Sequence, residues 1–305
     1  MKKINSEVIS EIIDAKNIEG AGDLAKSQTY KYSSGIERER YDIVNEEQAK
    51  YYGKQIGKYE LISVPHILEL TNHSIHKVVD VIAQVLKDIL VDIDNNSKVL
   101  IVGLGNRHIS ADSLGSKVVG GINVTFSDKF PRVMAIAPSV LGLTGIETYD
   151  IVSGVINKVK PTHLILIDSL CASSESRLGK SIQITNTGIC PGSGIGNNRK
   201  CLDKNLAENV VSIGVPLLIY TSTFVEEYLD KFDINLDRIN SIMQTMKNSG
   251  SNGTFVDLCK DIEKCLDYSY DSSIVTIKDI EECVDILSKI IYKAINKALG
   301  VNFEK

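Results

Sequence analysis

The chain has 305 residues, of which 43% are hydrophobic and 24% charged, a composition that is typical of a soluble globular protein. Its formal net charge of -5 argues against direct binding of nucleic acid, although a nucleic-acid-binding protein stays open as a partner. The sequence contains no run of about 18 apolar residues and no signal-peptide stretch at its N-terminus. We therefore expect a cytoplasmic protein that does not enter a membrane.

The N-terminal region is polar over residues 1 to about 35 and shows little periodicity. Such a sequence predicts an arm or loosely held extension that can be removed. Residues 36–65 contain short alternating stretches, which predict edge strands around a small helix.

The rest of the chain alternates between helix and strand patterns. Residues 73–93 place apolar residues three and four apart, which predicts an amphipathic helix, and residues 98–105 form an apolar run that suits a buried parallel strand. The later predicted helices are 110–122 and 147–160, and the later predicted strands are 132–138, 162–170, 181–189 and 209–220. This order predicts a single three-layer α/β/α domain with a mostly parallel sheet and a helical C-terminal region from about residue 222.

Two aspartates follow separate predicted strands. Asp112 lies just past the strand at 98–105, and Asp168 ends the apolar run "HLILID". Because ligands of such sheets bind outside the carboxyl ends of the strands, we expect the two carboxyls to face one another there. A facing pair can share a proton, which raises one pKa and lets the pair hold and activate water. The alternatives are a helix first-turn acid at Asp112 and a loop-capping acid at Asp168.

The segment "NTGICPGSGIGNNRK", residues 186–200, is called the glycine-rich segment below. It lacks the pattern of a P-loop, and "GLGN" at 103–106 lacks the third glycine of a dinucleotide fingerprint. Backbone amides of such a segment suit an anion, an oxyanion or a peptide backbone, and a purely structural turn is equally open.

The metal-ligating residue types are scattered. The six cysteines contain no C-x-x-C pair, and His73 and His76, which can share a helix face, have no third ligand nearby. Zinc sites usually need such close sets of ligands. We therefore expect free thiols, no resident metal and no cofactor.

Several long stretches resemble the germination proteases of spore-forming bacteria. They are "VLIVGLGNRHISADSLGSKVV", "AIAPSVLGLTGIETYDIVSGVINKVKPTHLILIDSL", "SIQITNTGICPGSGIGNNRK" and "VVSIGVPLLI". These stretches occur in the order of the family, and the resemblance runs along most of residues 36–225. The chain departs from the family at Arg107, Ser139 and Ser173, where tryptophan, glycine and arginine are usual, which concerns the fit of the substrate.

The resemblance implies an endopeptidase that degrades small acid-soluble spore proteins during germination, in the forespore and spore core. It implies a fold akin to the hydrogenase maturation proteases, a homotetramer, and a zymogen that loses an N-terminal segment. The stretch "GDLA" stands where the family has T-D-L-A, so that the implied propeptide is residues 1–23, cut near Asp23 and Leu24, and the protease domain is residues 24–305.

The resemblance also implies which residues are catalytic. The family motif T-P-D-A-L-G is matched by residues 110–115 and A-I-D-A-L by residues 166–170, which assigns Asp112 and Asp168 as the catalytic pair. From its position, the glycine-rich segment is predicted to form a wall of the cleft. The predicted substrate-binding residues are Asn106, Gly192, Ser193, Gly194 and Gly196.

Other functions stay open at this point. One is a maturation-type protease that acts on a metalloprotein, and another is a non-catalytic α/β module that binds an anion through the glycine-rich segment. Participation of a metal is open too, with His108, four residues before Asp112, as its candidate ligand.

Overall fold

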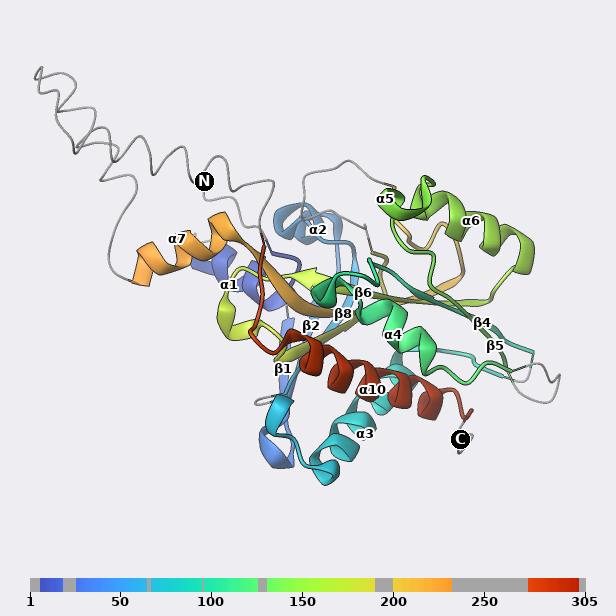
Figure 1. Cartoon of the computed structure of the whole chain (residues 1–305), viewed down its shortest axis with the longest axis horizontal. Coiled ribbons are helices and arrows are strands. Elements are labelled where there is room, and N and C mark those ends of the chain that lie inside the picture. Colours follow the sequence, from blue (N-terminus) through green and yellow to red (C-terminus); the bar gives the residue numbers. More distant parts are fainter. Residues whose placement is uncertain are drawn as a thin grey trace, which may run out of the picture.

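A sheet of nine strands runs through the centre of the part of the chain that the structure describes (Figure 1). The computed structural model describes residues 6–18, 26–64, 67–94, 96–125, 131–189, 200–231 and 274–301.

Neighbouring strands in one part of the sheet run parallel. In order across the sheet, these strands are β5 (Arg132–Ile136), β4 (Lys98–Gly103), β6 (His163–Cys171) and β8 (Asn209–Tyr220). Their sequences are nearly continuous apolar runs because helices cover both of their faces. Each of the four lies within a few residues of the strand that the sequence predicts.

The rest of the sheet is antiparallel. From β8 it continues through β7 (Ser181–Thr185), β3 (Gly57–Ser63), β2 (Glu37–Ile43) and β1 (Lys26–Lys31), and β9 (Ile274–Val275) pairs with the end of β8. Residues 172–180, between β6 and β7, are too few for a parallel crossover, so that β7 has to return antiparallel. The α/β fold is confirmed, whereas the sheet is mixed rather than mostly parallel.

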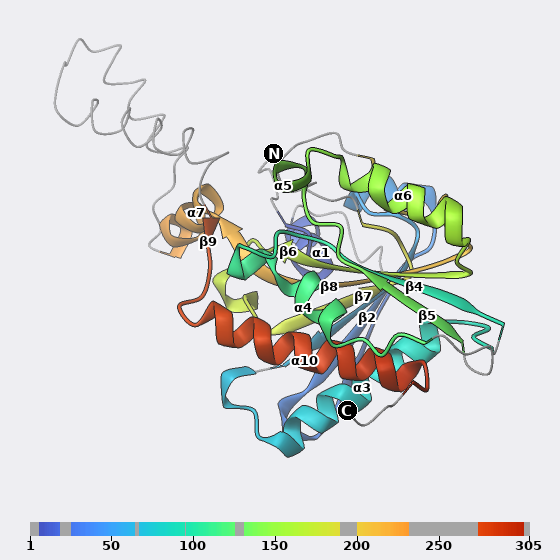
Figure 2. The same ribbon diagram turned by 45° about the vertical axis from the view of Figure 1, so that its right-hand side comes forward.

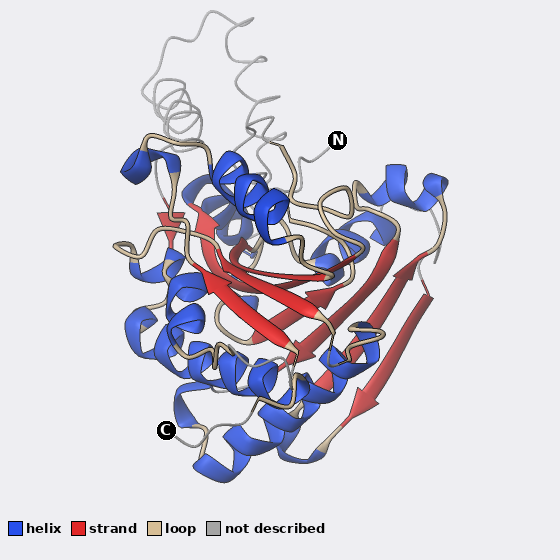
Figure 3. Cartoon of the chain, turned by 90° about the vertical axis from the view of Figure 1, so that its right-hand side faces the viewer, coloured by secondary structure: helices blue, strands red, loops and turns tan. Residues whose placement is uncertain are grey.

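Helices form a layer on each face of the sheet, as the three-layer prediction requires (Figures 2 and 3). One layer consists of α3 (Asn72–Ile89), α4 (Leu114–Gly120) and α10 (Ile280–Ala298). The other consists of α1 (Ile9–Ile18), α2 (Glu46–Tyr52) and α6 (Thr148–Val159). In Figure 2, α3 and α10 lie side by side below the sheet. The predicted apolar stripe of α3 packs against α10 and the strands.

The remaining helical elements are α5 (Leu141–Thr144), α7 (Thr221–Lys231) and 3-10 turns at Ser33–Gly35, Ile67–Glu69, Ser110–Asp112 and Glu175–Arg177. Helices α7 and α10 agree with the helical region predicted from about residue 222, and residues 232–273 lie outside the described residues.

The N-terminal segment is firmly packed where it is described, so that the prediction of a loosely held extension is wrong for residues 6–18. Val8 and Ile9 are fully buried, and α1 packs on β2, β3 and α2. Glu11 accepts hydrogen bonds from the backbone N–H groups of Ser173 (2.7 Å) and Ser174 (3.1 Å). Strand β1 is held as well, by six residue pairs with β2.

A buried ion pair joins β2 to β3. The guanidinium of Arg38 donates from Nε and Nη2 to the two carboxylate oxygens of Glu60, each at 2.8 Å, and Glu60 is only 2% exposed. Such a fork-to-fork pair is well satisfied, but a partner left alone in this position would be a buried, uncompensated charge.

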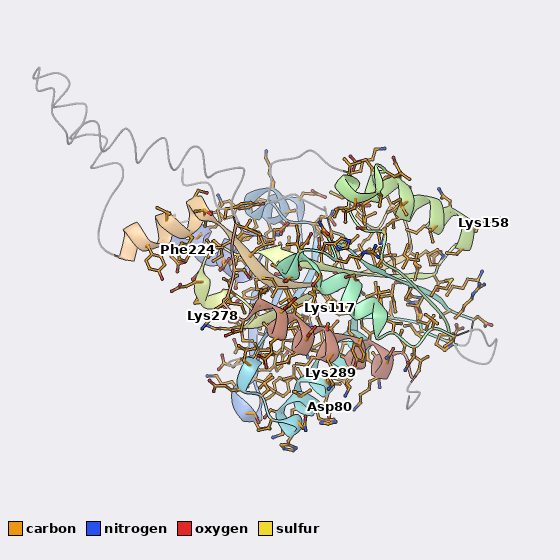
Figure 4. All side chains as sticks on the ribbon, in the orientation of Figure 1. Asp80, Lys117, Lys158, Phe224, Lys278 and Lys289 are labelled. Atoms are coloured by element: carbon orange, nitrogen blue, oxygen red, sulfur yellow. The ribbon has the colours of Figure 1, made fainter. Side chains whose placement is uncertain are left out.

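We predict that Glu60→Gln lowers the free energy of unfolding by about 3 kcal/mol, because it removes the closest countercharge of the buried guanidinium and leaves only the more exposed Asp88, at 3.7 Å. The control is Asp80→Asn, which breaks the exposed pair between Lys297 and Asp80 on the outer surface of α3 (Figure 4). It should cost less than about 1 kcal/mol. Denaturant unfolding of both variants measures the difference, and equal losses would contradict a structural role for the buried pair.

Candidate active site

Asp112 is placed by the loop that follows β4. It ends the 3-10 turn Ser110–Asp112, and its Oδ2 accepts a hydrogen bond of 2.7 Å from the backbone N–H of Asn106. Gly105 has a φ of +97°, and a Cβ at this position would lie 2.6 Å from Oδ1 of Asp112. Glycine at 105 therefore lets the loop close around the carboxylate.

Asp168 lies where β4 stops and β6 continues. The pairing of β4 with β6 ends at Gly103 and Ile167, whereas β6 runs on beside β8 as far as Cys171. Asp168 is thus the first residue past the end of β4 and not, as predicted, the last residue of its own strand. Its Oδ1 accepts the N–H of Ser169 at 2.9 Å. By the alternation of β6, its side chain faces the layer of α1, α2 and α6.

The carboxyls of Asp112 and Asp168 lie close enough for the charge of one to affect the other, and both residues are half-buried. Burial raises the pKa of Asp168 well above its ordinary value, and the charges of Asp112 and then Glu7 raise this pKa further. Burial also raises the pKa of Asp112 to about 6, against the opposing hydrogen bond from Asn106. Both shifts are upward and the pKa of Asp168 is raised more strongly, so that Asp112 is the member of the pair that ionises more readily.

The N-terminal segment lies beside this pair. The backbone N–H of Glu7 donates to the carbonyl of Cys171 (2.9 Å), and Oε2 of Glu7 accepts the N–H of Cys171 (2.8 Å). Lys54 Nζ donates to the carbonyl of Glu7 at 3.0 Å. Sequence reasoning missed these residues, because the sequence gives no signal that joins position 7 to position 171.

A cavity of about 170 Å³ lies next to the pair. It is lined by Glu7, Lys54, Tyr59, Gln183 and Gly214, among others, and it reaches Gly188 and Ile189 of the glycine-rich segment. Gly214 pairs with Asp168 across β6 and β8, so that the cavity lies one strand away from Asp168.

The other predicted site residues have different positions. Asn106 lies against Asp112, but it makes this contact through its backbone N–H, while its side-chain oxygen accepts the N–H of His108 at 2.9 Å. Gly192, Ser193, Gly194 and Gly196 lie outside the described residues, as do Asp23 and Leu24. Their roles stay predictions.

Neither a thiol nor a metal cluster accompanies the carboxyls in the described ranges. Burial raises the pKa of the Cys171 thiol to about 12, which makes it a poor nucleophile at neutral pH. Cys171 and Cys283 are free as expected, whereas Cys201 is disulfide-bonded, so that the expectation of free thiols is wrong there. Among the described residues, no group of three or more His, Cys, Asp or Glu is placed to hold a metal ion, and His108 is exposed.

Comparison with known proteins places the chain in a family. Residues 14–252 match the germination protease family. The chain belongs to the germination protease family, and it is a peptidase. The germination protease of Clostridium perfringens is 34% identical over 281 residues, which cover 86% of this chain and 83% of the relative. That of Clostridium tetani is 33% identical over 310 residues, covering 95% and 92%.

Among solved structures, a NiFe-hydrogenase maturation protease from Thermococcus kodakarensis is similar to part of this germination protease family member. The match covers 44% of this chain and 80% of the maturation protease, with 20% sequence identity and a TM-score of 0.32. None of the described helices is long and apolar enough to cross a membrane.

We predict that Asp112→Asn stabilises the fold at neutral pH. The pKa of Asp112 is about 6 in the folded state and 3.8 in the unfolded chain, so that the folded state binds this proton more tightly. The stability that the protonated Asp112 provides is therefore complete below pH 3.8 and is lost as the pH rises through 6. Asparagine does not titrate. The variant should therefore gain up to about 3 kcal/mol over wild type above pH 7 and nothing below about pH 4.

Urea unfolding of both chains across this pH range measures the effect, with Asp80→Asn as an exposed control that should show no such gain. An Asp112→Asn chain that is less stable than wild type at neutral pH would mean that the carboxylate is not desolvated in the folded state.

Proposed function

We propose that this chain is an endopeptidase that degrades small acid-soluble spore proteins during germination, with a water activated by Asp112 and Asp168. The observation that carries the proposal is that the two carboxyls lie close enough at the end of β4 for the charge of Asp112 to raise the pKa of Asp168. The substrate class comes from the sequence resemblance, and membership of the germination protease family agrees with it. The spore core and the homotetramer are further predictions from that resemblance.

The protonation states of the pair suit hydrolysis of a peptide bond. The Asp112 carboxylate accepts a proton from water as the water oxygen attacks the scissile carbonyl carbon. The Asp168 carboxylic acid then donates its proton to the leaving nitrogen as the C–N bond breaks. Asp112 ends protonated and Asp168 ionised, and return of the proton through the next water restores the starting pair.

We further propose that residues 1–23 are a propeptide, with cleavage near Asp23 and Leu24. The position of residues 6–18 supports this idea, because Glu7 lies beside Asp168 and Glu11 holds the backbone after β6. A substrate would have to displace this segment to reach the pair.

We predict that Asp112→Asn and Asp168→Asn each reduce turnover by about 10²–10⁴-fold, because the base and the acid are both required. The double variant should be little worse than either single one, since residues that act as a unit are not additive. Cleavage of a purified small acid-soluble spore protein is measured, with Asp80→Asn as the matched control.

Unfolding measured on the same samples separates loss of chemistry from loss of fold. A folded single variant with near wild-type turnover would contradict the aspartate pair. A wild-type chain that leaves the spore protein whole would favour the anion-binding module.

We predict that a chain that begins at Leu24 cleaves this substrate faster than the full chain. In the full chain, Glu11→Gln should also raise activity, because it weakens charge-assisted hydrogen bonds that contribute roughly 1.5–3 kcal/mol each to docking of the segment. Equal specific activities of the three proteins would contradict the propeptide.

A further inference from the structure

Gln183 is a polar residue on an inward face of the sheet. Its neighbours Ile182 and Ile184 point into the core beneath α3 and α10, and Gln183 therefore faces the opposite layer, as Asp168 does. Gln183 pairs with Gly214 of β8, and Gly214 pairs with Asp168 of β6. The amide and the carboxyl thus stand in one row, two strands apart, which is about 10 Å between their Cα atoms.

Between them, the row has no side chain. A Cβ at position 214 would lie 2.5 Å from Cδ1 of Leu170, so that only glycine fits there. The side chain of Leu170 covers Gly214, and both residues line the cavity described above together with Gln183 and Glu7. The cavity thus extends from Gln183 to β8, the strand beside Asp168.

Gln183 already holds a main chain in this position. Its Oε1 accepts the backbone N–H of Ile9 at 2.8 Å, and its Nε2 donates to the carbonyl of Glu7 at 3.3 Å. One side-chain amide therefore pairs with the backbone acceptor of Glu7 and the backbone donor of Ile9, the first residue of α1. Lys54 and the backbone of Cys171 complete the contacts of Glu7.

We propose that Gln183 binds the main chain of the substrate beside the catalytic pair, at the place that Glu7 and Ile9 occupy when the N-terminal segment is docked. This inference rests on the endopeptidase function proposed above. When the segment leaves, a buried amide loses both of its partners, and a buried polar group of this kind needs new ones. A peptide backbone offers the same donor and acceptor whatever its side chains are.

The test is a double-mutant cycle between Gln183 and the substrate backbone. The probe is a synthetic peptide that contains one cleavage site of a small acid-soluble spore protein, together with a series in which one amide N–H at a time is replaced by an ester oxygen. The full chain and its processed form are both assayed, and variants are compared within the form that cleaves. The variants are Gln183→Met, nearly isosteric and without either hydrogen-bonding group, and Gln84→Met on the outer surface of α3 as control.

With wild type and with the control, one ester of the series should raise KM about two- to tenfold, the effect of one lost hydrogen bond. With Gln183→Met, KM for the all-amide peptide should rise by a similar factor, kcat should change little, and the same ester should have no further effect. Gln183→Glu keeps the acceptor and should keep the ester sensitivity, which provides a second variant if Gln183→Met does not fold.

An unchanged KM with Gln183→Met, or an ester profile that stays the same, would overturn the inference. If Gln183 served only to hold the N-terminal segment, its loss would release the segment and raise the activity of the full chain with no rise in KM. A wild-type chain that cleaves no member of the series would overturn the endopeptidase function itself, which is a different result from cleavage that ignores Gln183.

Discussion

Two carboxyl groups that lie close together repel one another when both are charged, and the proposed chemistry of the molecule depends on this repulsion. Burial alone raises the pKa of Asp112 to about 6, and Asp168 has the additional charge of Asp112 beside it. Loss of the first proton therefore makes loss of the second harder. In the proposed mechanism this difference supplies an acid and a base from two chemically identical groups.

The sheet creates this difference through unequal strand lengths. Strand β4 ends at Gly103, one position before the level of Asp168, and the loop that follows carries Asp112 across the carboxyl end of β4. Strands β6 and β8 continue past this level, so that Asp168 lies between paired strands rather than at a free end. The same extension places Gly214 and Gln183 in line with the acid, so that the mixed part of the sheet forms the floor on which the N-terminal segment lies.

The sequence identified the local elements of this site and not their long-range partners. The apolar runs of β4 and β6 and the rule that ligands gather at carboxyl ends were sufficient to select Asp112 and Asp168. The extent of β6 past Asp168 depends on the length of β8 beside it, which no local pattern encodes. Helix α1 was missed because its buried residues, Ile9, Ile12 and Ile13, lie among polar ones in the sequence. Part of its support is also distant in the chain, since Glu11 holds the backbone of Ser173 and Ser174. The order in which β1, β2 and β3 follow β7 across the sheet also depends on long-range pairing, which no local sequence pattern encodes.

The position of helix α10 late in the chain affects when, during synthesis, the loop after β4 can be held in its folded position. Helix α10 fills the core beneath the sheet with residues such as Leu287 and Ile291, and it packs on α3, α4 and the turn that carries Asp112. That turn has no complete support until residue 298 has left the ribosome. Because the loop after β4 is synthesised long before α10, a nascent chain contains Asp112 and Asp168 well before it contains the helix that supports the turn of Asp112. The arrangement of the two carboxyls can therefore be completed only after α10 has been synthesised.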